Sequence, residues 1–371
     1  MKTIGISTIC KSENYGACLQ SFALYEYIRQ KGYDVSIIDF LRPGHPDFMR
    51  CSIDEEKGKR YDGAKFNLKA FISQLLYDVR DFSCRRVRKK NFARFNNRIK
   101  FTKTYCSLNE LYTDPPLFDI YLTGSDQVWC PAREFANDPY LLTFAPAVAN
   151  KYAYAPSISV NNIPIEYKDL FKRALIEYDS ISVRENEAAQ LLSDEFEYNN
   201  VQVVLDPTFL LDEKYWGKIS QKPKYEDYIL FYPIGINSKL QEYAVKVSKR
   251  LGKKLLYLRP VTNSTLKSSN YISVNDAGPE EMLGLIKNAS AVLTDSYHGV
   301  IFSILFRVPF YLHVVKYSSR YLTLNDKINI ENNFLTDFNP ENFLPKPISD
   351  TSIELLNKEI KQSQHFLDFL F

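Results

Sequence analysis

The sequence predicts an α/β protein built from two Rossmann-like domains in succession. Its 371 residues are too many for one ordinary hydrophobic core. Short apolar runs rich in β-branched residues alternate with segments whose apolar residues recur at helical spacing. This alternation is interrupted after residue 210 and resumes near residue 228. We therefore predict an N-terminal α/β domain over 1–210, a C-terminal α/β domain over 211–350 and a final helix over 351–371.

The first forty residues are expected to form a strand, a helix and a second strand. A β-branched run from Ile4 to Ile9 precedes a turn, and Ala17 to Lys31 carries apolar residues at helical spacing. Gly32 is a typical C-cap for that helix, and the second strand follows at 35–39. A helical excursion is predicted over 66–101. Further strands of this domain are expected at 119–123, 151–155, 180–183 and 201–205.

The second half of the chain repeats the alternation. Two successive α/β halves that face each other across a cleft indicate a GT-B-like arrangement, a form that many nucleotide-sugar glycosyltransferases also use. The segment 352–371 is amphipathic, and we expect this last helix to cross back onto the first domain. The strands of the second half are predicted at 228–232, 254–258, 271–274, 291–294 and 310–314, and its helices at 239–251, 279–288 and 299–306.

The bulk composition excludes several classes of protein. A net charge of +3 gives no strong attraction to nucleic acid. The six cysteines form no C-x-x-C pair and no cluster with histidine, which argues against a zinc site and for reduced thiols. The chain shows no signal-peptide pattern and no apolar run near the ~18–20 residues that cross a bilayer. We expect a cytoplasmic protein that at most contacts the inner face of the membrane.

A basic segment, 83–100, allows two interpretations. It contains many Arg and Lys and no acidic residue. One interpretation is the solvated face of a helix. The other is peripheral contact with an anionic membrane surface, where each cation contributes roughly 1 kcal/mol. Apolar residues interleave with the cations at Val87, Phe92, Phe95 and Ile99.

The turn Asp295–Gly299 is the strongest candidate site. A hydrophobic strand leads into it and a helix begins at once, so unpaired N–H groups at the positive end of the helix dipole favour an anion there. Gly299 lets a ligand approach the backbone closely. His298 would stand beside the anion with a proton that it can donate near neutral pH. The alternative is a structural cap with a satisfied histidine.

Three cations lie at other predicted strand ends. Arg184 ends a strand of the first domain, where its guanidinium can bind a carboxylate or phosphate through two N–H groups. The alternative for Arg184 is an internal ion pair with a neighbouring glutamate. Lys316 and Arg320 follow the last strand of the second domain and would add positive charge beside the 295–299 turn. Their alternative is a solvated loop.

Polar turns at two further strand ends suit a sugar. Asp126 and Gln127 can bind hydroxyl groups, and an apolar sugar face can rest on Trp129. The alternative is an Asx-type turn with the indole in the core. The turn 14–16 is a weaker signal, since many strand-to-helix turns look alike. The motifs that bind ATP or NAD and the spacings that bind a metal are missing from the sequence.

Together these motifs resemble the polysaccharide pyruvyl transferase family. They occur in the order found in that family, from about residue 4 to residue 325. Each piece is short, and it is the order and the separations that make the resemblance specific. The pieces are Asn14-Tyr15-Gly16-Ala17 with Leu19-Gln20, Gly124–Trp129, Ser182–Glu185, Asp206-Pro207-Thr208, Ser296–Gly299 with Ser303, and Ser319-Arg320.

The resemblance implies a donor, phosphoenolpyruvate, and an acceptor sugar or lipid-linked oligosaccharide that receives a pyruvate ketal. It also implies a GT-B-like fold, a role in bacterial surface polysaccharide synthesis, and no cofactor or metal. Family members carry an Arg two residues before the motif His. That position is Ser296 here, and Arg320 or Lys316 is the natural substitute.

These observations give each candidate residue an expected role. His298 is the expected acid that protonates the donor, and Asp126 accepts the hydroxyl proton or orients the sugar. Donor binding is expected from Arg184, Arg320, Lys316, Ser296 and Gly299. Acceptor binding is expected from Asn14, Tyr15, Gly16, Gln127 and Trp129.

Two other functions are compatible with the sequence. A nucleotide-sugar glycosyltransferase of GT-B type would need a glutamate that grips the ribose, and Glu280 and Glu281 lie near such a place. A non-catalytic glycan-binding relative would keep the fold and lose the chemistry, and Ser296 is its main support.

Overall fold

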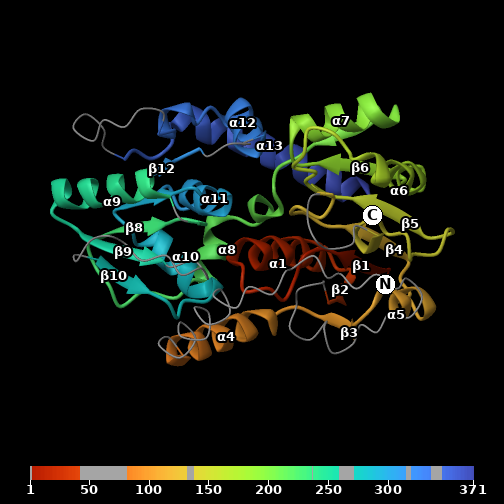
Figure 1. The fold of residues 1–371 in the computed structure, drawn as a ribbon, viewed down its shortest axis with the longest axis horizontal. Coiled ribbons are helices and arrows are strands. Elements are labelled where there is room, and N and C mark those ends of the chain that lie inside the picture. Colours follow the sequence, from red (N-terminus) through yellow and green to blue (C-terminus); the bar gives the residue numbers. More distant parts are fainter. Residues whose placement is uncertain are drawn as a thin grey trace.

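Two parallel β-sheets with helices on their faces form the fold (Figure 1). Each half places its strands in Rossmann-like order, and the α/β, GT-B-like fold class is confirmed. The computed structural model describes residues 2–41, 82–131, 138–235, 237–258, 271–314, 319–335 and 345–371.

The first sheet has the strand order β3-β2-β1-β4-β5-β6-β7, and every neighbouring pair is parallel. The central strand β1 is fully buried apart from its first residue, with Ile4 opposite Val35 on one side and Ile120 on the other. Parallel strands buried on both faces need continuous apolar runs, which is what the sequence supplies. The strands are β1 (Thr3–Ser7), β2 (Asp34–Phe40), β3 (Phe101–Tyr105), β4 (Ile120–Thr123), β5 (Asn150–Ala153), β6 (Ser180–Val183) and β7 (Val201–Val203).

The second sheet has the order β10-β9-β8-β11-β12 and is also parallel throughout. Strand β11 lies between β8 and β12, and the helix that carries the 295–299 turn follows it. The strands are β8 (Tyr228–Tyr232), β9 (Lys254–Leu258), β10 (Tyr271–Val274), β11 (Ala291–Thr294) and β12 (Phe310–Leu312).

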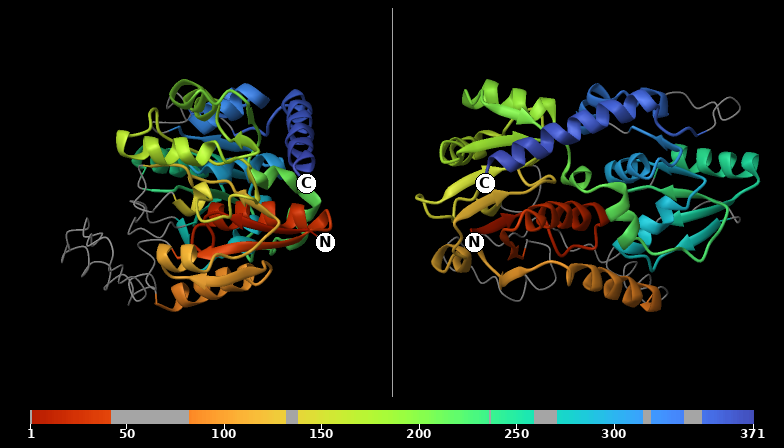
Figure 2. Two further views of the ribbon diagram at one scale, coloured as in Figure 1. Left: turned by 90° about the vertical axis from the view of Figure 1, so that its right-hand side faces the viewer. Right: turned by 180° about the vertical axis from the view of Figure 1, so that it is seen from behind.

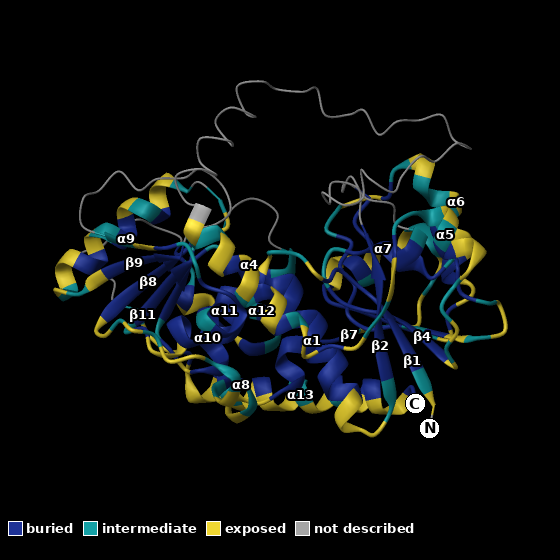
Figure 3. Ribbon diagram, turned by 90° about the horizontal axis from the view of Figure 1, so that it is seen from below, coloured by how far each residue is buried: buried dark blue, intermediate teal, exposed yellow. Residues whose placement is uncertain are grey.

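Helices cover the two sheets, and the sides of the helices that face away from the sheets are exposed (Figure 3). The described helices of the first half are α1 (Tyr15–Gln30), α4 (Phe82–Asn96), α5 (Leu108–Thr113), α6 (Ile165–Leu175) and α7 (Asn186–Phe196). Those after the first sheet are α8 (Glu213–Ile219), α9 (Ser238–Leu251), α10 (Pro279–Lys287), α11 (Tyr297–Leu305), α12 (Ser319–Ile328) and α13 (Asp350–Phe369). Short 3-10 turns occupy Asp138–Leu141, Pro207–Leu210 and Glu331–Asn333.

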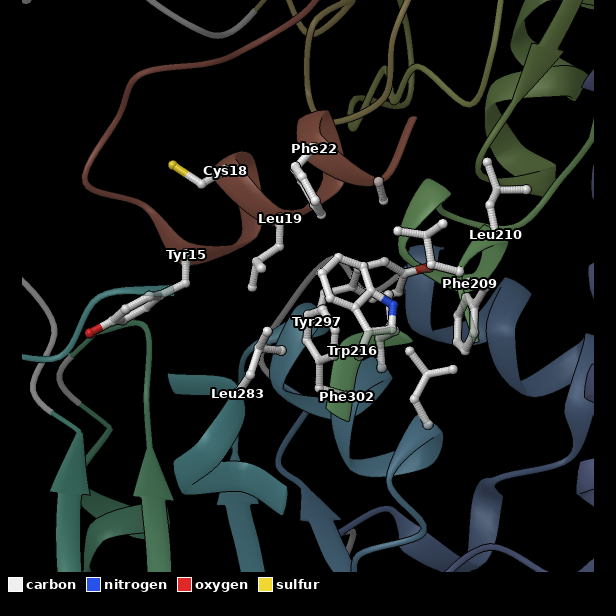
Figure 4. Close-up of a cluster of buried hydrophobic side chains, with 14 of the residues drawn as sticks. Tyr15, Cys18, Leu19, Phe22, Phe209, Leu210, Trp216, Leu283, Tyr297 and Phe302 are labelled. Atoms are coloured by element: carbon white, nitrogen blue, oxygen red, sulfur yellow. The ribbon is translucent and has the colours of Figure 1, made fainter. Parts of the chain in front are cut away.

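One continuous hydrophobic core joins the two halves. Helix α1 is buried from Tyr15 to Ile28, because the first sheet lies on one side of it and α10 and α11 on the other. Figure 4 shows side chains from both halves meeting there, with Leu19 of α1 near Trp216 of α8 and Phe302 of α11. The halves are therefore packed against each other and not merely tethered.

Two helices connect the halves from opposite sides. Helix α4 lies beneath α1 and packs on α10 of the second half (Figure 1). Helix α13 begins beside α12 and ends on the first half, where Phe366 packs near Tyr154 (Figure 2). The last helix thus crosses back as expected.

The structure corrects three expected elements. The helical excursion over 66–101 is too long, because α4 ends at Asn96 and an edge strand, β3, starts at Phe101; residues 66–81 lie outside the described part. The segment expected to be a plain linker contains α8, and α12 follows β12 where a loop was expected. The predicted domain bounds stay a prediction.

Candidate active site

The site forms where the carboxyl ends of strands from both sheets meet. Residues that follow β6 and β7 in the first sheet contact the first turn of α11, which follows β11 in the second. Parallel α/β sheets bind ligands at this end of their strands, because the loops there are free of the ladder.

Asp206, directly after β7, is the central acceptor of the site. It is fully buried, and its Oδ2 accepts a hydrogen bond from Nη1 of Arg184 at 2.9 Å. The same oxygen lies 3.5 Å from Nε2 of His298. Its Oδ1 accepts from the backbone N–H and the hydroxyl of Thr208, at 3.0 and 2.7 Å. Asp206 therefore links the two halves at the site.

Arg184 is held inside the protein by two carboxylates. Its Nε donates to Oε1 of Glu185 at 3.2 Å, and its Nη1 donates to Asp206. The internal ion pair considered from the sequence is thus present. Nη2 is buried and has no hydrogen-bond partner within the described residues. Arg184 therefore keeps one N–H-bearing nitrogen for another ligand.

His298 lies between the two halves and is only 8 % exposed. Its Nε2 faces Asp206 and finds no hydrogen-bond partner in the described part of the chain. On the opposite side, Nδ1 would be 2.1 Å from a Cβ placed on Gly16 of α1. Only glycine lets α1 come this close to the ring, so the expected cleft is closed at this point.

Tyr297 separates the two arginines that the sequence singled out. The Arg184 guanidinium lies 5.0 Å from the centre of its ring and that of Arg320 5.5 Å. Arg320 is half-buried in the first turn of α12 and forms no ion pair with any described residue. Its expected role in donor binding stays a prediction. Lys316 lies outside the described residues.

The electrostatics of the two carboxylates differ. Burial opposes the ionisation of Asp206, but the neighbouring imidazole of His298 and the charge of Arg184 more than offset it and hold the pKa of Asp206 well below its usual range. Burial raises the pKa of Glu185, although Arg184 opposes this. One carboxylate is thus held ionised, and the other is pushed towards its neutral form.

Ser296 and Gly299 complete the helix and do not offer an open anion site. Ser296 is the N-cap of α11, and its hydroxyl accepts a hydrogen bond from the N–H of Gly299 at 3.2 Å. A Cβ on Gly299 would lie 2.7 Å from Oγ1 of Thr294, so glycine is required there by packing. The expectation that a ligand approaches this backbone is corrected.

The acceptor-side turn before α1 has structural duties. Asn14 is the exposed N-cap of α1 and accepts from Ala17 N–H at 3.2 Å. Tyr15 is buried, and its hydroxyl donates to the carbonyl of Ala277 in the second half at 2.9 Å. Of this turn, Gly16 reaches His298, whereas Tyr15 joins the halves and its hydroxyl is not free to bind a sugar.

The turn after β4 gives a mixed result. Asp126 and Gln127 are half-buried at the sheet edge, and Nε2 of Gln127 donates to Ser159 at 3.0 Å. Asp126 has a positive φ of 77°, and its Oδ1 accepts from the N–H of Gln127 at 2.8 Å. Trp129 is fully buried and donates to the carbonyl of Tyr140 at 2.9 Å. The expectation that a sugar stacks on Trp129 is therefore wrong.

Sequence reasoning missed the roles of Asp206 and Glu185. The Asp-Pro-Thr pattern signals an N-cap with Pro in the first helical position, and Asp206 does cap a 3-10 turn. Nothing in its spacing shows that the second carboxylate oxygen faces His298. Glu185 was considered only as an ion-pair partner of Arg184.

A half-open pocket of about 270 Å³ lies away from this site, between α1 and α13. Its charged groups, Lys31 and Asp368, bind each other at 2.7 Å. The candidate site is placed around Asp206 instead, because buried polar atoms of Arg184, in the first half, and His298, in the second, lack partners there within the described residues. Among the described residues, no three His, Cys, Asp or Glu side chains are placed to hold a metal ion, and no helix is long and apolar enough to cross a membrane.

Comparisons with known proteins agree with this arrangement. A family model described as polysaccharide pyruvyl transferase matches residues 14–317. The fold is similar to that of a UDP-GlcNAc 2-epimerase from Methanocaldococcus jannaschii, with 12% identity, a TM-score of 0.53 and coverage of 100% of this chain and 99% of that one. A UDP-GlcNAc 2-epimerase from Neisseria meningitidis gives 8% identity and a TM-score of 0.50 over 100% and 94% of the two chains. No functionally curated protein matches the sequence.

Proposed function

Since this chain belongs to the polysaccharide pyruvyl transferase family, we propose that it transfers the pyruvyl group of phosphoenolpyruvate to two hydroxyl groups of a sugar. The product is a pyruvate ketal on a precursor of a bacterial surface polysaccharide. The acceptor is a sugar or lipid-linked oligosaccharide with two hydroxyl groups close enough to bridge.

One observation carries this proposal: a buried guanidinium with an unpartnered nitrogen lies beside a histidine at the junction of the two halves. Arg184 keeps Nη2 without a partner within the described residues, and both Arg184 and His298 contact Asp206. Arg320 adds a half-buried cation on the other side of Tyr297. Phosphoenolpyruvate carries a carboxylate and a phosphate, and guanidinium groups bind both well.

The proposed reaction needs one acid and one base. His298 gives a proton to the methylene carbon of the donor, and the electron pair of the double bond forms the new C–H bond. A sugar hydroxyl then adds to the central carbon and loses its proton to Asp126. A second hydroxyl displaces the phosphate and closes the ketal. Of the two hydroxyl protons, one replaces the proton that His298 gave and the other leaves with the phosphate. Electrostatic positioning supplies most of the rate.

Helix α4 supports contact with a membrane surface only through its exposed basic residues. Phe92, Phe95 and Ile99 are buried against the core, so these three do not face a membrane, whereas Val87 of α4 is exposed. Arg86, Lys89 and Lys90 are exposed. Contact with an anionic inner membrane surface, and a cytoplasmic location, remain part of the proposal.

The test is phosphate release by the purified full-length protein. With phosphoenolpyruvate and acceptor glycans that carry paired hydroxyls, we expect phosphate release that requires both substrates. The variant His298→Ala should lose at least about 10²-fold in kcat, as is typical when a general acid is removed. Near-full activity of His298→Ala would show that the acid is another residue.

A matched control is available on the last helix. His365 is exposed on α13, so His365→Ala should keep the activity of the unmodified protein. For the donor, Arg320→Ala should raise the KM for phosphoenolpyruvate, whereas Arg173→Ala, an exposed arginine on α6, should not. Sugar binding without turnover of any donor would favour a non-catalytic relative instead.

The nucleotide-sugar alternative finds no support in the structure. Glu280 accepts hydrogen bonds from Arg94 and Arg98, and Glu281 accepts from Arg94 and from the N–H of Gly278. Both glutamates therefore hold α4 against α10, and neither is free to grip a ribose.

A further inference from the structure

Asp206 belongs to the first half of the chain but faces the imidazole of the second. One carboxylate oxygen, Oδ1, is fixed by Thr208 through a backbone N–H and a hydroxyl. The other, Oδ2, is directed at Arg184 and, at 3.5 Å, at Nε2 of His298. Since the carboxylate is anchored at one end, it presents its second oxygen to the ring in a fixed direction.

The buried charges give this contact a purpose. Arg184, Glu185 and Asp206 are 2%, 1% and 0% exposed, and when all are ionised they carry one positive and two negative charges. An unbalanced buried charge is costly. The excess of negative charge therefore favours a further hydrogen-bond donor beside the two carboxylates. Arg320, half-buried beyond Tyr297, offsets part of the excess. Nε2 of His298 lies 3.5 Å from Oδ2 of Asp206 and has no hydrogen-bond partner in the described chain.

The two ring nitrogens of His298 have different neighbours. Nε2 faces Asp206, whereas Nδ1 faces Gly16 in the first turn of α1. Gly16 belongs to the turn predicted to contact the acceptor. Nδ1 therefore lies on the side of the ring away from Asp206, against the backbone of Gly16.

We propose that Asp206 is a positioning residue that holds the Nε2–H of His298, so that Nδ1 is the nitrogen that gives the proton to the donor. This inference rests on the proposed pyruvyl transfer and specifies how its acid is oriented. Asp206 itself does not touch the substrate. Carboxylates that orient a catalytic histidine fix its tautomer and ring direction in the same way.

The tautomer of His298 tests this inference without any turnover. The chain has four histidines, so a ¹⁵N-imidazole-labelled protein gives few signals, and the variant His298→Gln identifies the relevant one. At a pH where the ring is neutral, we expect hydrogen on Nε2 in the unmodified protein. In Asp206→Asn, that preference should be lost. An unchanged tautomer in Asp206→Asn would overturn the inference.

Kinetics provide the second readout. Asp206→Asn should lower kcat for phosphate release by roughly 10²-fold or more, with a smaller change in the KM for phosphoenolpyruvate. Thr208→Val keeps the charge of Asp206 but removes one of its anchors, and should give an intermediate loss of about 3–10-fold, since one of the two bonds to Oδ1 remains. If Asp206→Asn fails to fold, Thr208→Val still tests the inference, because full activity with an unchanged tautomer would contradict it.

A matched control separates positioning from the general cost of removing a buried carboxylate. Asp39 at the end of β2 is 1% exposed and pairs with Lys11, so Asp39→Asn should lose stability but keep the His298 tautomer. If the unmodified protein turned over no donor while Asp206→Asn still changed the tautomer, the proposed function would fail and the positioning role would stand. If the unmodified protein turned over phosphoenolpyruvate and Asp206→Asn had the same kcat, the positioning role would fail and the proposed function would stand.

Discussion

Glu185 has one carboxylate oxygen, Oε2, that is buried without a hydrogen-bond partner among the described residues. Its other oxygen accepts from Nε of Arg184 at 3.2 Å. Burial raises the pKa of Glu185 above its usual value near 4.5, although Arg184, Ser157 and Arg320 oppose this. The folded protein therefore holds a proton on Glu185 more readily than the unfolded chain does.

The raised pKa of Glu185 predicts a pH dependence of stability. A carboxyl with a raised pKa in the folded state loses stabilising free energy as the pH rises from its unfolded pKa through its folded pKa. Relative to the unmodified protein, Glu185→Gln should thus gain stability between pH 4 and pH 8, by about 1.4 kcal/mol for each tenfold difference between the folded and unfolded acid dissociation constants. Urea unfolding of both proteins at the two pH values measures this difference.

A neighbouring glutamate serves as the control for Glu185. Glu187 is exposed in the first turn of α7, so Glu187→Gln should show almost no such difference between the two pH values. A Glu185→Gln variant that lost stability relative to the unmodified protein on going from pH 4 to pH 8 would contradict the direction in which burial moves this pKa.

At the residue scale, the sequence identified several residues of the candidate site but not the carboxylate that they contact. His298, Arg184, Arg320 and Gly16 were all named from motifs at strand ends, where parallel sheets expose their loops. Asp206 was missed because its capping pattern explains it fully as a local residue. Trp129 was misjudged because an indole after a strand looks the same whether it faces a ligand or the core.

Helix α4 shows how one element can hold two halves together. Glu280 of α10 is 3% exposed and accepts hydrogen bonds from Nε and Nη2 of Arg98 at 3.0 and 2.6 Å. Nε of Arg94 donates to the other oxygen at 3.0 Å. Nearer the N-terminus of α4, Arg88 is buried and donates to the carbonyl of Ala277 at 3.2 Å. Arg88, Arg94 and Arg98 thus bind residues of the second half, whereas other cations of α4 are exposed.

Removing this acceptor should loosen α4. Glu280→Ala leaves two half-exposed arginines without their shared carboxylate, and we expect a loss of about 1–3 kcal/mol in the free energy of unfolding. Denaturant titration gives the value. Glu242→Ala, which breaks an exposed pair with Lys246 on α9, should cost at most about 0.5 kcal/mol. Equal losses for the two variants would mean that the α4 contacts contribute little.

At the element scale, the buried strands could be predicted and the edge strand β3 could not. Strands such as β6 and β8 were placed with their exact bounds, because continuous apolar runs have few other uses. Strand β3 was not predicted, because its residues are mostly half-buried or exposed at the sheet edge and form no continuous apolar run. The connecting helices α8 and α12 are short and lacked a clear periodic signal.

Across the whole molecule, α13 ties the second half to the first. Near its start, Ser352 donates to the carbonyl of Asn329 at 2.8 Å, and Lys327 pairs with Glu359 at 2.5 Å. Near its end, Ser363 accepts from the N–H of Leu205 at 2.9 Å, and Leu367 is fully buried. Its crossing was predicted from its amphipathic pattern, whereas the continuous core beneath it could not be read from sequence.

The contacts of α13 with both halves predict that the two halves unfold together. Calorimetry of the unmodified protein should show one transition, because the core and α13 span both halves. Leu367→Ala should lower the free energy of unfolding by about 2–5 kcal/mol, while Phe369→Ala, 82% exposed on the same helix, should change it by less than about 0.5 kcal/mol. Two separate transitions would show that the halves are independent.

The contact between Gly16 and His298 has a consequence for water. A pyruvyl carbon that has lost electron density reacts with water as readily as with a sugar, and hydrolysis would waste the donor. Because α1 seals the ring and Arg184 and Asp206 are 2% and 0% exposed, bulk solvent has little access to the place where that carbon would form. In the proposed transfer, the hydroxyl groups of the acceptor would then meet little competition from water.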